Sequence, residues 1–175
     1  MKIILKVGYL IMAKRLRKKT TIATNTLMVF PNDTNDIGTM YGGKLIEVMD
    51  MVGGICARRF SSHKAVTASI EDMQFIQPVG KGDIVEFKSV VIYTGTTSLI
   101  VKTKVTKEGY SEEKTLCARA YFIYVAIDKN RKPVEVPELI VETEKEILNQ
   151  QIGAEIKKRQ ALEEKRFQIE LKENL

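Results

Sequence analysis

One segment in the first half of the chain is apolar on nearly every helical face, and this feature restricts the possible folds most. Apolar residues recur there with the 3.6-residue period of a helix, at Leu45, Met49, Val52 and Cys56. A helix that is apolar all round is buried, so the rest of the chain has to enclose it. Gly53 and Gly54 in its middle each cost roughly 1 kcal/mol relative to alanine. We therefore expect another backbone to pass close to them.

The segments that could enclose this helix have the pattern of strands. A β-prone run precedes the helix at residues 24–30, and four runs follow it, at residues 66–76, 84–93, 97–106 and 116–127. Alternation of apolar and polar residues with short turns predicts an antiparallel meander. A single sheet can bury one apolar helix by curling around it. The predicted fold class is therefore α+β, an antiparallel sheet wrapped around one long central helix.

Residues 138–175 have a different character and predict a C-terminal helical extension. The region beyond Pro137 lacks proline, and Leu148, Ile152 and Ile156 are spaced four residues apart. We expect one long amphipathic helix, or two with a break near Gly153, packed on a subunit surface. An unbroken helix would reach roughly 50 Å at 1.5 Å per residue. Its role is open, and an assembly contact is the first hypothesis.

The net charge of +6 comes from the N-terminus. Residues 1–21 contain no acid and seven basic residues: Lys2, Lys6, Lys14, Arg15, Arg17, Lys18 and Lys19. Residues 22–137 have a net charge of +1, and residues 138–175 a net charge of −2. A basic tail is not a basic binding face, so no nucleic-acid partner is expected.

The N-terminal segment does not have the pattern of a targeting signal. Residues 1–13 are mildly apolar, but Lys6 interrupts them and the basic cluster follows rather than precedes them. The run is also too short to span a bilayer. We expect Met12 to be the natural start and the protein to be cytoplasmic. Residues 1–21 are assigned to a basic N-terminal extension. We predict that deletion of residues 1–19 leaves turnover and the thermal midpoint nearly unchanged.

Few residues could bind a metal. His63 is the one histidine, which excludes a site built from several histidines. Cys56 and Cys117 lie far apart in apolar surroundings, which predicts two buried thiols in a reducing compartment rather than a disulfide framework or a zinc cluster. We therefore expect no metal at the functional site.

The polar loop at residues 31–43 and the helix after it contain the candidate catalytic groups. Gly42 and Gly43 at the helix start leave backbone N–H groups open to a developing oxyanion, although such a dipeptide is also common in turns. Asp50 lies among apolar helix residues, where a carboxylate is either functional or paired for structural reasons. Asn35 in the loop has the alternative role of a cap or turn residue.

These motifs, taken in order, resemble the hotdog-fold acyl-CoA thioesterases of the cytosolic acyl-CoA hydrolase family. The pattern Pro-x-Asp-Thr-Asn-x-x-Gly-x-x-Tyr-Gly-Gly spans residues 31–43, and Leu-Ile-x-x-Met-Asp spans residues 45–50. Further matches follow in order: Val66-Thr67, Glu71-x-Met73-x-Phe75, Pro78-Val79-x-x-Gly82-Asp83 and Gly95-Thr96-Thr97-Ser98. The resemblance covers about residues 24–137 and implies the curled sheet and central helix expected above.

The resemblance implies a role for each candidate residue. Asp50 stands at the position of the family's catalytic carboxylate, and Asn35 at that of its partner amide. Gly42 and Gly43 would hold the thioester oxygen. Asp50 would then act as a general base on water or as the nucleophile, and the sequence leaves this choice open. Because the thiolate of coenzyme A leaves readily, no metal or cofactor is implied beyond the coenzyme A of the substrate.

The phosphates of coenzyme A imply polar and basic groups near the site. The candidates are Arg58, Arg59, Lys64, Thr96, Thr97 and Ser98, each of which could instead be an ordinary surface residue. Many family members have Phe or His where this chain has Tyr41. The domain boundaries that follow are 1–21 for the extension, 22–137 for a hotdog thioesterase domain and 138–175 for the helical extension.

The resemblance also implies self-association, first as a homodimer and then as a trimer of dimers. Asp50 lies eight residues beyond Gly42, roughly 12 Å along the helix, so one thioester cannot readily contact both in one protomer. A second, antiparallel copy of the helix would bring them together. We therefore expect an active site shared between two chains.

Two alternatives to an acyl-CoA thioesterase stay open. A hotdog module that binds acyl-CoA without hydrolysing it could use the basic cluster as a nucleic-acid arm, but such a module needs neither Asp50 nor Asn35. A hotdog dehydratase or thioester hydratase typically pairs a histidine with a carboxylate. His63 lies instead in a polar loop.

Overall fold

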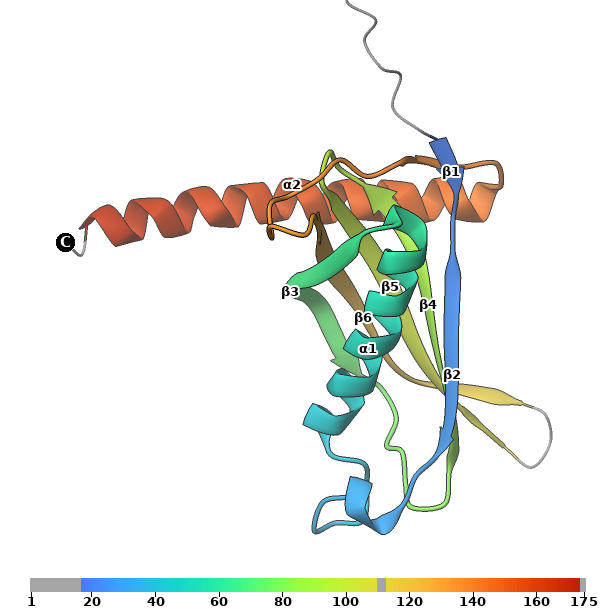
Figure 1. Cartoon of the computed structure of the whole chain (residues 1–175). Helices are drawn as coiled ribbons and strands as arrows, with labels where there is room; N and C mark the ends of the chain where they lie inside the picture. The colour runs from blue at the N-terminus through green and yellow to red at the C-terminus, as the bar shows by residue number, and fades with distance from the viewer. Residues whose placement is uncertain (1–16, 110–112, 174–175) are drawn as a thin grey trace, which may run out of the picture.

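The structure, a computed structural model, describes residues 17–109 and 113–173. One helix, α1 (Gly42–Ser61), lies against the inner face of a five-stranded antiparallel sheet (Figure 1). The strand order is β2 (Ile22–Met28), β4 (Ile84–Thr94), β5 (Ser98–Glu108), β6 (Lys114–Ile127) and β3 (Lys64–Phe75). This is the α+β hotdog fold that the sequence predicted.

The topology differs from the expected four-strand meander in one respect. Only β4, β5 and β6 follow one another as neighbours, and β3 pairs with β6 at the far edge of the sheet. The physical reason is that α1 crosses the sheet, so the chain leaves the helix on the side away from β2. The segment between β3 and β4 then returns to β2, and the second edge of β3 pairs with no other strand of the described chain.

The core lies between α1 and the inner face of the sheet. Leu45, Met49 and Cys56 are buried there against sheet residues such as Phe87 and Phe122. Gly53 is explained by a side chain rather than by the nearby backbone that was expected, whereas a Cβ atom on Gly54 would make only an ordinary contact at 3.8 Å. A Cβ atom on Gly53 would overlap the hydroxyl of Tyr124, whose ring lies across the helix. Cys56 and Cys117 are both free and buried, as predicted.

The basic N-terminal region is in part structured. A short strand, β1 (Arg17–Lys19), pairs in parallel with β7 (Glu138–Ile140). The Lys18 ammonium donates hydrogen bonds to the carbonyl oxygens of Arg59 (2.6 Å) and Phe60 (2.9 Å) at the end of α1. Residues 17–19 therefore contact the body, so the reason given for expecting them to be dispensable does not hold for them. The proposed start at Met12 lies outside the described residues.

The C-terminal extension is one helix, α2 (Glu144–Glu173), and it continues through Gly153 without a break. Its first half packs on the outer face of the sheet in a second apolar cluster made by Ile92, Ile100, Tyr121, Ile123, Ile152 and Ile156. Gly153 allows this contact, because a Cβ atom there would overlap the side chain of Tyr93. The second half extends beyond β3 (Figure 1). In the described part of the chain, no helix is both long and apolar enough to cross a membrane.

Candidate active site

Asp50 lies halfway along α1, and two hydroxyl groups lie within hydrogen-bond distance of its Oδ1. The Thr67 hydroxyl of β3 donates to Asp50 Oδ1 at 2.6 Å, and the Tyr124 hydroxyl of β6 lies 3.1 Å from the same oxygen. The Tyr124 hydroxyl is also 2.8 Å from the carbonyl oxygen of Asp50. Among the described residues, none donates a hydrogen bond to Oδ2. One carboxylate oxygen is therefore fixed, and the other is available to a water molecule or a substrate.

The tyrosine that holds Asp50 stays protonated over the physiological range. Burial, and then the charge of Asp50, raise the pKa of the Tyr124 phenol far above its usual value of 10. A neutral phenol can donate to a carboxylate but cannot repel it. Tyr124 therefore fixes the orientation of Asp50 and does not compete with it as a base.

Asn35 lies in the loop before α1, and its amide closes that loop. Its Oδ1 accepts hydrogen bonds from the N–H groups of Ile37 (3.2 Å) and Thr39 (3.0 Å), and its Nδ2 donates to the Thr39 hydroxyl at 3.1 Å. These bonds are all local, and none links Asn35 to Asp50. Within one protomer the turn role is therefore observed, while one N–H of the exposed amide is left for another group.

Gly42 and Gly43 are the first two residues of α1, as predicted. The first N–H groups of a helix have no intrahelical acceptor, and the helix dipole makes them favourable for a negative charge. A Cβ atom on Gly42 would lie 3.0 Å from the Phe75 ring, and one on Gly43 would lie 3.1 Å from the Tyr41 ring. Glycine therefore keeps this helix start narrow enough to fit between two aromatic side chains.

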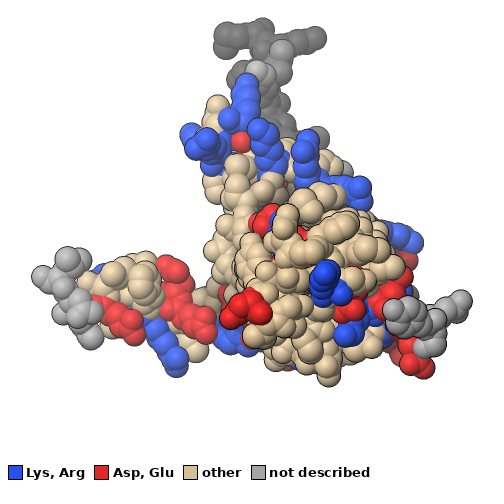
Figure 2. Space-filling view, turned by 90° about the horizontal axis from the view of Figure 1, so that it is seen from below, with Lys and Arg blue, Asp and Glu red and all other residues tan. Residues whose placement is uncertain are grey.

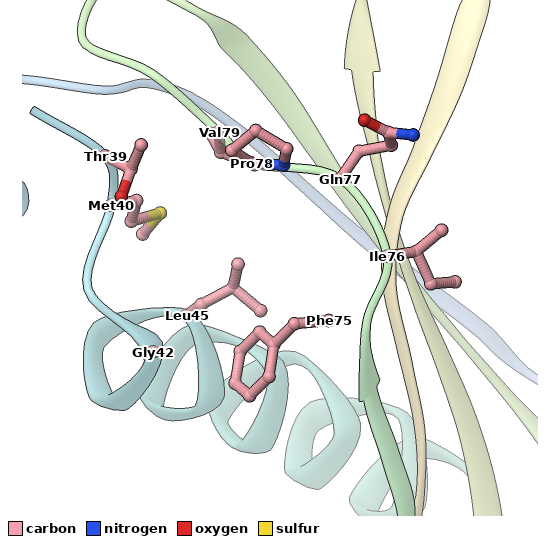
Figure 3. A pocket seen from close by; sticks show the side chains of 9 residues that line it. All are labelled: Thr39, Met40, Gly42, Leu45, Phe75, Ile76, Gln77, Pro78 and Val79. Atoms are coloured by element: carbon pink, nitrogen blue, oxygen red, sulfur yellow. The ribbon is translucent and has the colours of Figure 1, made fainter. Parts of the chain in front are cut away.

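A hollow of about 390 Å³ opens beside the helix start (Figure 3). Its lining is mainly apolar and comes from the loop before α1, the first turn of α1 and the segment after β3: Thr39, Met40, Gly42, Leu45, Phe75, Ile76, Gln77, Pro78 and Val79. Gly42 at its edge places the open end of the helix next to this apolar space. The hollow can thus receive a hydrocarbon group whose polar end points to the helix start.

The candidate phosphate-binding residues lie at the opposite end of α1. Arg58 and Arg59 are in its last turn, and Lys64 is the first residue of β3. Thr96 and Thr97 lie in the turn between β4 and β5, and Ser98 is the first residue of β5. They are at the same end of the sheet as Lys64, since Ser98 and Lys64 pair with β6 only two residues apart, at Val125 and Ile127. Ser98 is buried, whereas both arginines are exposed.

A single protomer therefore separates the predicted site into three places. The helix start with Gly42 and the Asn35 loop is at one end, Asp50 is in the middle, and the basic residues are at the other end. The 20-residue helix is about 30 Å long, so no one ligand group can contact both ends. The structure brings Asp50 together with Thr67 and Tyr124, and leaves the other groups apart.

Comparison with known proteins identifies the family. The family model described as "Thioesterase superfamily" matches residues 37–114. An uncharacterized acyl-CoA thioester hydrolase of Bacillus subtilis is 40% identical over 131 residues, which cover 74% of this chain and 76% of that protein. The chain belongs to the thioesterase superfamily. The resemblance that the motifs predicted is confirmed.

Solved structures add detail about this superfamily protein. An acyl-CoA hydrolase of Staphylococcus aureus, solved with butyryl coenzyme A and coenzyme A, has a TM-score of 0.79 and 29% identity, and covers 85% of this chain and 92% of its own. Three variants of that hydrolase replace an asparagine, an aspartate and a threonine by alanine. The replaced residues are separated by 15 and 17 positions. Those intervals equal the separations of Asn35, Asp50 and Thr67.

Two further relatives bear on assembly and location. A hexameric thioesterase of Yersinia pestis has a TM-score of 0.62 and 32% identity, and covers 66% of this chain and 95% of its own. A cytosolic acyl coenzyme A thioester hydrolase of the rat is 31% identical over 122 residues, which cover 68% of this chain but 32% of that protein.

Sequence analysis missed Tyr124 as a site residue and treated Thr67 only as part of a motif. The signal for Tyr124 was indirect, because nothing local marks a strand tyrosine as a partner of a helix carboxylate. Gly53, three residues after Asp50, was the available sign that a bulky group lies across the helix there.

Proposed function

We propose that this protein hydrolyses acyl-CoA thioesters to a free acid and coenzyme A. The observation that carries the proposal is the fixed Asp50 carboxylate, bonded to Thr67 and placed on the buried helix that starts at Gly42. The acyl-CoA hydrolases among its relatives support it, as do the matching intervals of Asn35, Asp50 and Thr67 in the Staphylococcus aureus enzyme.

In the proposed reaction, Asp50 acts as a general base. Its free oxygen takes a proton from a water molecule, whose oxygen attacks the thioester carbonyl carbon. The carbonyl oxygen becomes an oxyanion at the N–H groups of Gly42 and Gly43, and the Asn35 amide orients the water. The C–S bond then breaks, coenzyme A leaves as a thiolate, and the proton on Asp50 returns to the products. No metal or cofactor is needed, because the thiolate is a good leaving group.

General-base attack is favoured over nucleophilic attack by the hydrogen bonding of Asp50. The hydroxyl groups on Oδ1 lower the basicity and the nucleophilicity of the carboxylate alike, but they also hold it in one orientation. A positioned base gains from that orientation, since the water has to be placed accurately. The apolar hollow beside Gly42 would receive the acyl chain.

The site is proposed to be completed by a second copy of the chain. β3 is a 12-residue edge strand, and such an edge is an aggregation risk unless it is paired. Apolar side chains are exposed beside it on β3 and on the neighbouring side of α1: Met51, Ile55, Val66, Ile70 and Phe75. Pairing of β3 with β3 of a second copy would cover them and place the two α1 helices antiparallel. Three such dimers would give the hexamer found for the Yersinia pestis relative.

In that dimer, the two α1 helices lie next to each other and run in opposite directions. The start of one helix, with Gly42, comes beside the middle and end of the other, with Asp50 and Arg59. The separated candidates in one protomer, including Lys64 and the Thr96–Ser98 turn, would then surround one substrate, with residues 22–137 as the catalytic domain. We further propose that the enzyme acts in the cytoplasm, as the rat relative's name indicates for that protein, and that it binds no nucleic acid.

The test is a panel of acyl-CoA chain lengths with the released thiol measured for the wild type and for Asp50→Asn. Losing a positioned base costs typically 10²–10⁴-fold, so the variant should lose at least 100-fold in kcat/KM and keep its thermal midpoint. Glu47→Gln, one turn earlier on the exposed side of the same helix, is the matched control and should keep its activity. Near-normal turnover by Asp50→Asn would reject the assignment. Tight acyl-CoA binding without thiol release by the wild type would favour the non-catalytic regulator.

A further inference from the structure

The second half of α2 is solvent-exposed over its described residues. Every described residue from 161 to 172 is exposed, including Leu162, Phe167, Ile169 and Leu171. Figure 2, seen from below, shows this half projecting from the body as an arm. A helical segment of about 12 residues is marginal in water without tertiary contacts. Four large apolar side chains on such a segment indicate a surface that covers them.

The arm leaves the body over the free edge of the sheet. Arg159 donates a hydrogen bond to Asp72 at 2.8 Å, and Gln160 donates one to the Ser69 hydroxyl at 3.3 Å. Both acceptors lie on β3, the edge strand. A helix that crosses this edge continues over whatever pairs with β3. If a second copy pairs there, the arm of each chain lies on the outer face of the other chain's sheet.

The same two hydrogen bonds determine how α2 is rotated about its axis relative to the strands. Ser69 pairs with Ile123, whereas the strand beyond Asp72 pairs Gln74 with Arg119. The Arg159 side of α2 therefore faces the Arg119 end of the sheet. Residues at helical spacing from Arg159 share this side: Leu148 three turns before it, Leu162 one turn after it and Ile169 about three turns after it.

A row of cations lies on the outer sheet face next to the path of α2. Lys88, Lys104 and Arg119 are directly opposite one another on β4, β5 and β6, and all three are exposed. Like charges opposite each other destabilise a sheet. None of the three forms an ion pair with a described carboxylate. An anionic neighbour from a second chain would offset this repulsion.

A groove of about 160 Å³ connects this row with the start of α2. Lys88, Lys102 and Lys104 line it from the sheet, and Lys145 and Asn149 line it from the helix. Burial, and then the nearby Lys104, Arg119 and Lys145, lower the pKa of Lys102. An acidic or apolar helix face would fit along this groove better than a second basic one.

The arm has a face of that character. Ile156 points to the sheet, and positions at whole helical turns beyond it continue the sheet-facing side. At roughly 100° per residue these positions are Glu163, Phe167, Glu170 and Leu171. Of the three basic residues of the arm, Lys165 and Lys172 fall on the opposite side, and Arg166 lies on the flank, close to the line of Arg159. The side of the arm that would meet a second sheet is thus acidic and apolar.

We propose that α2 is a shared arm, whose second half docks on the outer sheet face of a second copy of this chain, along the Lys88–Lys104–Arg119 row. The proposal rests on the pairing of β3 proposed above. The two α2 helices then lie antiparallel and side by side, related by a two-fold axis near Arg159. Leu148 of each chain meets Ile169 of the other, and the two Leu162 side chains lie close to the axis.

This arrangement fixes the register of the two antiparallel α2 helices, and a cross-linking experiment can test it. Leu148 and Ile169 are 21 positions apart, so within one helix they are separated by roughly 32 Å. The two copies of Leu148 are also roughly 32 Å apart, as are the two copies of Ile169. Only a Leu148–Ile169 pair between chains is close, and a cross-link between these positions has to join two chains.

The experiment uses the full-length Leu148→Cys/Ile169→Cys variant with copper-catalysed air oxidation or a short bismaleimide. Both substituted side chains are more than half exposed, at 58% and 57%, whereas burial raises the pKa of the native Cys56 and Cys117 and protects them. We expect nearly all of the double variant to migrate as a covalent dimer. Each single variant should stay monomeric on the gel. A mixture of the two singles after subunit exchange should cross-link to about half, because random pairing makes half of the dimers mixed.

Four outcomes overturn the proposal. An assembled double variant that does not cross-link shows that the arms lie elsewhere. Equal cross-linking of the single variants shows a different register. If pyrophosphate protects Lys104 from acetylation while the double variant stays uncross-linked, the row is an anion site rather than a docking site for the arm. A wild type that elutes as a monomer rejects the pairing itself, whereas the thiol-release assay still decides the proposed function.

Discussion

At the residue scale, the hydroxyl of Tyr124 joins the packing of the core to the candidate chemistry. It occupies the space next to Gly53 and donates to Asp50. The absence of a side chain at Gly53 therefore allows the phenol to reach Asp50. Core glycines in a helix usually cost stability, and here a Cβ atom would overlap the phenol oxygen.

Gly53→Ala should therefore destabilise the protein by about 1–3 kcal/mol, because the new methyl group overlaps the phenol oxygen. Gly54→Ala is the control. The nearest Tyr124 atom would be 3.8 Å from its Cβ atom, so this substitution should be neutral or stabilise through helix propensity. Urea unfolding of both variants, and of Tyr124→Phe alone and combined with Gly53→Ala, measures the coupling. If Tyr124→Phe does not reduce the cost of Gly53→Ala, the contact is not its cause.

Thr67→Val should lower kcat/KM by about 10- to 100-fold, since a hydrogen bond to a charged group is worth about 1.5–3 kcal/mol. The shape of the side chain is kept, so the thermal midpoint should change little. Thr67→Ser restores the hydroxyl and should restore most of the activity. Equal activity of the valine and serine variants would show that the 2.6 Å bond to Asp50 has no catalytic consequence.

Tyr124 also predicts a dependence of stability on alkaline pH. Its folded-state pKa is raised, so above pH 10 the unfolded chain releases a proton that the folded chain keeps. Stability is therefore lost as pH rises above about 10, by up to about 1.4 kcal/mol per pH unit from this one group. Tyr124→Phe should have a shallower decline in its urea midpoint between pH 10 and 11.5. An unchanged slope would contradict the raised pKa.

At the scale of elements, β1 makes contacts that local sequence patterns did not predict. The seven basic residues of the N-terminus indicated a tail, yet Lys18 satisfies two carbonyl oxygens at the end of α1. A cation at a helix C-terminus is favourable, but its partner here is 41 residues away in sequence, which no local pattern reveals.

Deletion of residues 1–19 should accordingly lower the thermal midpoint by several degrees, because it removes β1 and the Lys18 bonds. Deletion of residues 1–16 keeps each of these contacts and serves as the control. Lys18→Met, which keeps the length of the side chain, should account for part of the loss. Differential scanning calorimetry of the three variants decides it, and equal midpoints for the two deletions would contradict a role for β1.

At the scale of the whole molecule, the three separated parts of the site require a second chain. Asn35→Ala and Asp50→Ala should each be inactive alone. When the two variants exchange subunits, a mixed dimer with shared sites has one site with both lesions and one with none. About a quarter of the wild-type activity should then return. No recovery, despite exchange proven by mass spectrometry, would place each site within one chain.

Much of this molecule could be predicted from local patterns and ordered motifs. The apolar helix, the five strands and the positions of Asp50, Gly42 and Gly43 follow from periodicity and residue type. What could not be predicted depends on partners far apart in sequence: the pairing of β3 with β6, the phenol over Gly53, and the close approach of Gly153 to Tyr93. Each of these is a tertiary contact between residues whose own neighbours give no sign of it.

The Gly53–Tyr124 contact also limits the order in which this protein can change over generations. A larger residue at position 53 is obstructed while the phenol is present, and loss of the phenol first leaves Asp50 with one fewer donor. We expect each single step to be costly, through folding stability in one case and turnover in the other. The two positions should therefore change together or not at all. A lineage that has lost the need for Asp50 is the one expected to carry alanine and phenylalanine there.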